Sequence, residues 1–253
     1  MNAELKTADN YTFLTRGIFL FIAVIILIIA DLLTGSVGLS FNDVKNNLFA
    51  ENNNSLAWIS LHEFRIPRVI TAIVSGIALS VSGLQMQTVF RNPLAGPYVL
   101  GISSGSGLGV ALLVVGLPGL FEFSVLESEN NMLLILASWL GAATVLILIL
   151  IVSFRLKNVM SILILGIMLG SGISAIINIL QYFSRESALK AFVIWTMGSL
   201  GGVSSNQIPY LLLGFLPGIL LAILIIKPSN AMLLGENYAR SLGVRILPYR
   251  IMV

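Results

Sequence analysis

Six stretches of the 253-residue sequence are apolar for about the length of a membrane-spanning helix. Each residue of a helix rises about 1.5 Å and the hydrocarbon core of a bilayer is about 30 Å thick, so a span needs about 20 mostly apolar residues. The stretches cover residues 17–33, 69–90, 99–117, 132–154, 159–182 and 208–226, and a seventh opens at Ile246. The sequence therefore predicts an all-α protein, a polytopic transmembrane helical bundle with six spans and the start of a seventh.

Charged residues are scarce. They make up 10% of this chain, whereas soluble domains carry about 25%. The net charge of +3 is therefore better explained by orientation in a membrane than by nucleic-acid binding. The sequence has no Cys and a single His, His62, so it offers no thiol nucleophile and no Cys or His cluster for a metal ion. We expect no nucleic-acid partner, no metal site and no cofactor bound by this chain.

The basic residues fall mainly on one side of the predicted spans. When the loops are assigned to alternate sides, nine of the 14 Lys and Arg residues lie on the side of the N-terminus. Acidic residues such as Asp43, Glu63 and Glu186 lie on the other side. Because cytoplasmic loops are enriched in Lys and Arg, the sequence predicts a multi-pass membrane protein with a cytoplasmic N-terminus.

The centres of the predicted spans lack charge. No Asp, Glu, Lys, Arg or His lies in the middle of one, and Asp31, near the outer end of the first span, comes closest. Ion-coupled carriers usually keep such a residue near the bilayer midplane. This weighs against a secondary transporter or channel that works without an ATPase, which remains the alternative interpretation.

Small and polar residues recur at helical spacing in three spans. The glycines on these faces are Gly76, Gly83, Gly101, Gly105, Gly109, Gly166 and Gly170. Such spacing allows close helix packing, which is the favoured interpretation of the glycines. Polar side chains in a membrane need hydrogen-bond partners, so Gln87, Ser174, Asn178 and Gln181 either pack against other helices or face a translocation path.

The loop between the second and third spans reads FRNPLAGPY. Pro93 and Pro97 block continuation of a helix, and Asn92 favours a turn or a cap. Because the connection is this short, the sequence predicts a tight re-entry at the membrane surface, which is a natural constriction at the inner mouth of a pathway.

The approach to the second span reads HEFRIPRVI, with Arg65 and Arg68 three residues apart and expected to be exposed on the outer side. Positive charge there runs against the inside bias, so we expect a partner such as acidic side chains on another protein. The alternative is a pair of arginines that extends to lipid phosphates.

Residues 227–248 read KPSNAMLLGENYARSLGVRILP and follow the sixth span on the cytoplasmic side. Ser229 or Asn230 is a candidate helix start, and Gly235 and Gly243 are candidate breaks, so the pattern predicts two short helices with apolar faces. These either lie on the lipid surface or dock in a groove of a partner.

A Gly-rich run, GISSGSGLG, opens the third span but lacks the G-x-x-x-x-G-K-[ST] pattern, and the chain contains no Gly-Lys pair. If ATP drives this protein, a separate subunit must bind it.

Three segments together resemble the FecCD-type permease family, the membrane subunits of type II ABC importers for iron-siderophores, haem and cobalamin. They read RIPRVITAIVSGIALSVSGLQMQTVFRNPLAGPYVLGISSGSGLG, VIWTMGSLGG and LLGENYARSLGVR, in the family's order and spacing. The resemblance implies a bacterial inner-membrane permease that is not itself an enzyme and that pairs with a copy of itself or a close relative. Its other partners would be an ATP-hydrolysing subunit and an extracytoplasmic substrate-binding protein.

The resemblance also implies roles for residues. Arg65 and Arg68 match arginines that hold acidic residues of the binding protein. Asn92, Pro93 and Leu94 match the cytoplasmic gate. Trp195 falls beside the outer cavity and joins Gln87, Ser174, Asn178 and Gln181 as a translocation-path candidate. The coupling helices, residues 229–243, would rest on the ATPase through Leu234, Gly235, Glu236, Ala239, Leu242 and Gly243.

Members of the family are expected to have ten spans, so this chain is expected to be a single but incomplete permease domain over residues 1–253, from a fragment or a truncated gene product. The function implied is import of an iron chelate, haem or cobalamin. Which of these is carried is not readable from the spans.

Overall fold

The computed structural model describes residues 2–35, 37–50, 55–116, 132–156 and 159–252, and these residues form helices with no strand among them. Internal contacts divide the chain into two compact units. Unit 1 comprises Met1–Ser75 and Leu200–Gly214, and unit 2 comprises Gly76–Ser199 and Phe215–Val253. The all-α prediction is confirmed.

Five helical segments among the described residues are long and apolar enough to cross a membrane: Leu14–Leu33, Leu56–Phe90, Met132–Ser153, Val159–Tyr182 and Ser205–Leu224. They correspond to five of the six predicted spans. The remaining prediction, residues 99–117, coincides with a shorter apolar helical segment, Ile102–Gly116, and residue 117 lies outside the described part. It is preceded by a short 3₁₀ turn, η2 (Pro97–Leu100), and consists of α5 (Ile102–Ala111) followed by a π-helical turn, η3 (Leu112–Gly116).

Unit 1 begins with α1 (Asn2–Leu33), followed by α2 (Phe41–Leu48) and α3 (Leu56–Ile59). A capping box starts α2: the Ser40 hydroxyl accepts the Asp43 backbone N–H at 3.2 Å, and the Asp43 carboxylate accepts the Ser40 N–H at 2.9 Å. Ser55 starts α3 by accepting the Trp58 N–H at 3.1 Å. Both helices therefore begin where side-chain oxygens satisfy free backbone donors.

A π-helical turn, η1 (Ser60–Arg65), leads directly into α4 (Ile66–Phe90). Pro67 lies at this junction and has no N–H to donate to the preceding turn. The Ser205 hydroxyl donates a hydrogen bond of 2.7 Å to the His62 carbonyl, which ties η5 (Ser205–Gln207), ahead of α10 (Ile208–Leu224), to η1. Widened turns of this kind often occur at functional sites, and this one carries Arg65.

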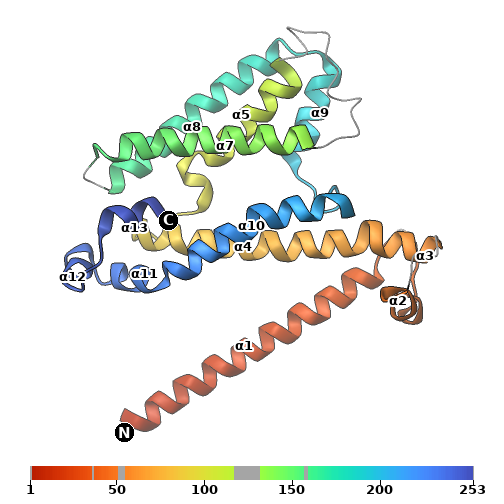
Figure 1. Cartoon of the computed structure of the whole chain (residues 1–253), viewed down its shortest axis with the longest axis horizontal. Coiled ribbons are helices and arrows are strands. Elements are labelled where there is room, and N and C mark those ends of the chain that lie inside the picture. The colour runs from red at the N-terminus through yellow and green to blue at the C-terminus, as the bar shows by residue number, and fades with distance from the viewer. Residues whose placement is uncertain (1, 36, 51–54, 117–131, 157–158, 253) are drawn as a thin grey trace. The chain divides into compact units, whose positions relative to one another are not determined.

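Unit 2 contains α5, α7 (Met132–Ser153), α8 (Val159–Tyr182) and α9 (Glu186–Met197), and Figure 1 shows α5, α7 and α8 side by side. Glycines make this packing possible. A Cβ on Gly105 would lie 2.6 Å from the Gly141 carbonyl oxygen, and one on Gly166 would lie 2.8 Å from the Leu100 Cα. The packing interpretation is confirmed for these positions, whereas a Cβ on Gly76 of α4 would meet no atom within 4 Å.

Unit 2 also contains the C-terminal helices α11 (Ile226–Leu233), α12 (Glu236–Ser241) and α13 (Ile246–Met252). They share a small hydrophobic core with the end of α4. Its buried members are Ile225, Met232, Ala239, Ile246 and Tyr249, and Val89 packs against them. The apolar stretch that opens at Ile246 thus forms a short helix within this core.

Candidate functional site

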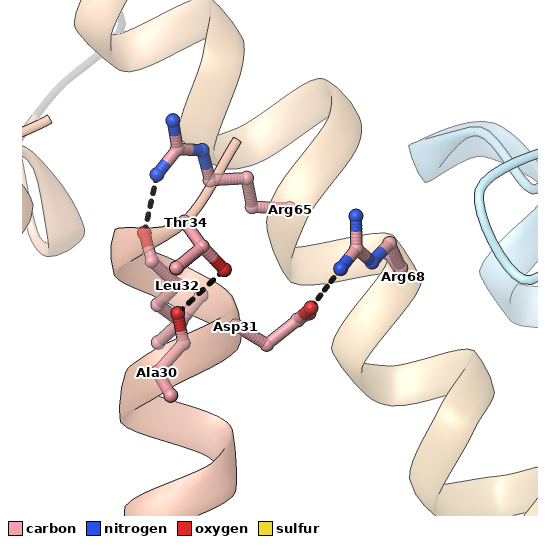
Figure 2. A network of polar contacts seen from close by, with 6 residues as sticks. All are labelled: Ala30, Asp31, Leu32, Thr34, Arg65 and Arg68. Atoms are coloured by element: carbon pink, nitrogen blue, oxygen red, sulfur yellow. Dashed lines mark hydrogen bonds and ion pairs between the residues drawn. The ribbon is translucent and has the colours of Figure 1, made fainter. Parts of the chain in front are cut away.

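The two arginines before and within α4 are bound to the end of α1. Arg65 donates from Nη1 to the Leu32 carbonyl at 2.6 Å and from Nη2 to the Val37 carbonyl. Arg68 forms an ion pair with the Asp31 carboxylate. Figure 2 shows both guanidinium groups directed toward the C-terminal end of α1.

The surroundings of the two arginines differ. Arg65 is only 6% exposed, so the prediction that it would be exposed is wrong. The reason is that the last carbonyls of a helix have no partner within the helix, and a guanidinium can satisfy them. The Arg68 side chain is 47% exposed, in agreement with the prediction.

Gly35 allows Arg65 to lie along the chain that follows α1. A Cβ on Gly35 would come 2.8 Å from Nη2 and 3.0 Å from Cζ of Arg65. The Ala30 carbonyl of α1 accepts both the Thr34 backbone N–H at 2.9 Å and the Thr34 hydroxyl at 2.8 Å. Carbonyls at the end of α1 therefore accept hydrogen bonds from side chains of both the following loop and η1.

A cavity of about 380 Å³ in unit 1 borders both arginines. Its walls come from the loop after α1, from α3 and η1, and from the turn at residue 201. They are Thr34, Gly35, Val37, Leu56, Ile59, Ser60, Phe64, Arg65, Arg68 and Gly201. In this lining the Arg68 guanidinium is exposed, whereas Arg65 is buried.

The loop that follows α4 holds the gate candidates in a defined turn. Arg91 has φ of 48°, and the Asn92 N–H bonds to the Gln87 carbonyl at 3.2 Å, a combination typical of a Schellman end of a helix. The Asn92 side-chain oxygen then accepts the Leu94 N–H at 2.9 Å. The predicted tight turn is confirmed. Leu94 is 85% exposed to solvent in this structure, and Pro93 is exposed as well.

The path candidates are distributed over three helices. Gln87 is exposed on α4, and Ser174 and Asn178 are exposed on one face of α8 with Gln181 half-buried one turn further on. The Ser174 hydroxyl donates to the Gly170 carbonyl at 2.9 Å, so its polar group is satisfied within its own helix. Trp195 of α9 stacks on Phe192 with a ring separation of 6.2 Å, within a hydrophobic cluster. The assignment of these five candidates, Gln87, Ser174, Asn178, Gln181 and Trp195, to a translocation path stays a prediction.

The coupling candidates form the two predicted short helices. The predicted breaks are confirmed, since Gly235 and Gly243 have φ of 115° and 83°, values that favour glycine. The predicted start at Ser229 or Asn230 is wrong, because α11 begins at Ile226, directly after the end of α10. Ser229 instead accepts a hydrogen bond of 3.2 Å from the Tyr249 hydroxyl.

The coupling residues divide into a buried and an exposed set. Ala239 is fully buried in the core shared by α11, α12 and α13, whereas Leu234 and Leu242 are 67% and 60% exposed. Glu236 and Gly235 are half-buried at the start of α12. Among the six coupling residues, Leu234 and Leu242 are the ones that present exposed apolar side chains to a partner.

The sequence predictions missed the pairing of Asp31 with Arg68. A signal was present, because an acid at the end of one span and a base at the start of the next fall on the same side of a membrane. The contacts of Arg65 could not be predicted in this way, because its acceptors are backbone carbonyls, which every residue has.

Residues 23–253 match the profile of the FecCD transport family. The hemin transport system permease protein HmuU of Yersinia pestis is 33% identical over 90% of this chain and 66% of its own length. An iron chelatin transport system permease protein of Helicobacter pylori is 32% identical over 88% of this chain and 67% of its own length. Other relatives are named as vitamin B12 and molybdate import permeases.

A solved structure agrees with these relatives. An ABC transporter described as of the metal-chelate type, in an inward-facing conformation, superposes with a TM-score of 0.75 at 27% identity, over 93% of this chain and 70% of that one. The chain spans about two thirds of the length of the relatives it matches. With its long apolar helices, it is a multi-pass membrane protein, and it belongs to the FecCD transport family.

Proposed function

We propose that this chain is the transmembrane permease subunit of an ATP-driven importer that brings an iron chelate, haem or cobalamin into the cytoplasm. The observation that carries the proposal is the match of residues 23–253 to the FecCD family, together with relatives named for hemin, iron chelatin and vitamin B12. The substrate passes between this permease and a second permease subunit, either an identical copy or a close relative.

The energy for transport comes from another subunit. The given sequence has no Gly-Lys pair and hence no phosphate-binding loop of the Walker type, which supports the proposal that a partner binds and hydrolyses ATP. The permease performs no chemical reaction. The scarcity of charge in its long apolar helices supports an external motor rather than coupling to an ion gradient.

The contact with the ATPase is made by α11 and α12. Leu234 and Leu242 enter a groove of the partner, because both are exposed apolar side chains of this segment, where Leu233 and Tyr238 are exposed as well. Gly235 and Gly243 set the angles at the two ends of α12, and Ala239 holds the segment against α13.

The loop after α4 forms the cytoplasmic gate. Asn92 fixes the turn through its bond to the Leu94 N–H, Pro93 prevents a helix, and the exposed Leu94 closes the path by contact with its counterpart in the second permease. Gln87, Ser174, Asn178, Gln181 and Trp195 are assigned to the walls of the path. The N-terminus lies in the cytoplasm, in the orientation that the loop charges favour.

The proposal is tested by transport. The protein is reconstituted in proteoliposomes with a candidate ATPase subunit and a candidate binding protein from the same organism, and uptake of labelled ferric catecholates, ferric hydroxamates, haem, cobalamin and molybdate is measured. We expect ATP-dependent uptake of one of the first four compounds and none with a non-hydrolysable ATP analogue. Uptake that needs only an ion gradient would contradict the proposal, and uptake of molybdate alone would contradict its substrate class.

A further inference from the structure

The end of α1 engages Arg65 and Arg68 in two different kinds of contact (Figure 2). Arg65 is buried and donates to two backbone carbonyls, those of Leu32 and Val37. Backbone carbonyls cannot be exchanged for a partner's groups without opening the end of the helix. Arg65 therefore stabilises the fold and is not available to bind a partner.

Arg68 is in the opposite situation. Its side chain is 47% exposed, and its partner Asp31 is 26% exposed. An ion pair this accessible to solvent typically shifts an equilibrium by a factor of only about two to five. A carboxylate from outside the chain can therefore replace Asp31 at little cost.

Asp31 is an unusual residue for its position. It lies in the last turn of an apolar segment, Leu14–Leu33, none of whose hydropathy window is buried within the structure. A carboxylate in such a segment is costly unless it has a partner. Its described partner is Arg68, whose guanidinium it holds beside the cavity that both arginines border.

We propose that Asp31 is a built-in counter-ion of Arg68, and that an acidic side chain of the binding protein must displace it on docking. Arg65 is a positioning residue that fixes the end of α1 and hence the place of Asp31. This inference rests on the proposed function and on the docking role that the family resemblance implies for Arg68, because it requires a binding protein that docks on this side of the permease.

The displacement has a thermodynamic consequence. Because the internal and external carboxylates compete for one guanidinium, Asp31 weakens docking, and docking weakens the Asp31–Arg68 pair by the same factor. The internal pair thereby lowers the affinity of docking by about two- to fivefold.

The test measures the dissociation constant of the binding protein for the full-length permease–ATPase complex in lipid nanodiscs. Asp31→Asn is compared with Glu63→Gln as the matched control. Glu63 is an exposed residue of η1, and its replacement by Gln removes the same single negative charge. The same substitution at Asp31 is also made in an Arg68→Gln background. Thermal unfolding of each variant confirms that it is folded.

We expect Asp31→Asn to bind the binding protein roughly two- to fivefold tighter than the wild type at low salt. Glu63→Gln should bind as the wild type does, and Asp31→Asn should have no effect once Arg68 is replaced. Unchanged or weaker docking of Asp31→Asn overturns the inference, as does an equal gain in Glu63→Gln, which would reflect net charge alone. A wild-type complex that does not dock at all overturns the proposed function itself.

Discussion

Gly105 of α5 lies against Gly141 of α7 so closely that a Cβ on Gly105 would come 2.6 Å from the Gly141 carbonyl oxygen. Gly105→Leu should therefore push the two helices apart and lower the free energy of unfolding by about 1–3 kcal/mol. Thermal unfolding in detergent measures the effect. Gly172→Ala on α8 is the control, because a Cβ there would meet no atom within 4 Å. A Gly105 variant as stable as that control would contradict the packing.

Gly35 and Arg65 should be energetically coupled. The Cβ of Gly35→Ala would displace the Arg65 guanidinium from the Leu32 and Val37 carbonyls, and a buried donor such as Arg65 left unsatisfied costs about 1–3 kcal/mol. Arg65→Ala should lower the unfolding temperature by itself, and Gly35→Ala should add little in that background.

The matched comparison for Arg65→Ala is Arg68→Ala. Removal of the exposed Arg68 side chain should cost less than about 1 kcal/mol, because its ion pair with Asp31 is open to solvent. An Arg68 variant that unfolds at a lower temperature than the Arg65 variant would reverse the roles assigned to the two residues.

Arg91 occupies a backbone conformation that favours glycine, with φ of 48°. Arg91→Gly should keep or raise stability, whereas Arg91→Val should lower it by about 1–3 kcal/mol, because a β-branched residue is strained there. Chemical denaturation of the two variants gives the difference directly. Equal stability of the two variants would show that the Schellman end of α4 is not held in this conformation.

Substitutions at Ala239 and Leu242 should have different effects, the first on the stability of the fold and the second on binding of the ATPase. Ala239→Leu should overpack the core of Met232 and Tyr249 and lower stability by about 1–3 kcal/mol. Leu242→Ala should leave the unfolding temperature unchanged and weaken co-purification of the ATPase. A Leu242 variant that retains full ATPase association would remove this residue from the proposed contact.

The spans were predictable because apolar length is a property of the sequence alone, and five of the described helices match it. The breaks at Gly235 and Gly243 were predictable for the same local reason, since their positive φ values are ones that glycine adopts easily. The start of α11 was not, because Ser229 resembles a cap but bonds to Tyr249, 20 residues away.

The two arginines, Arg65 and Arg68, show most clearly what could not be predicted from the sequence. Sequence spacing places Arg65 and Arg68 near the same face of a helix, and it predicts that both are exposed. Their different burial depends on the path of the chain after α1, where the carbonyls of Leu32 and Val37 approach Arg65. Every residue has a backbone carbonyl, so the sequence does not indicate which carbonyls will accept hydrogen bonds from a side chain. The different burial and bonding of Arg65 and Arg68 therefore become visible only in the three-dimensional structure.

The contacts between α1 and the start of α4 also bear on biosynthesis. Arg65 follows Leu32 by 33 residues and Arg68 follows Asp31 by 37, so α1 leaves the ribosome well before its partners do. Until then its last carbonyls and the Asp31 carboxylate have no counterpart from α4, and an unpaired acid opposes insertion into the bilayer. We therefore expect the first two apolar segments to insert into the bilayer as a hairpin, once Arg65 and Arg68 can pair with the end of α1.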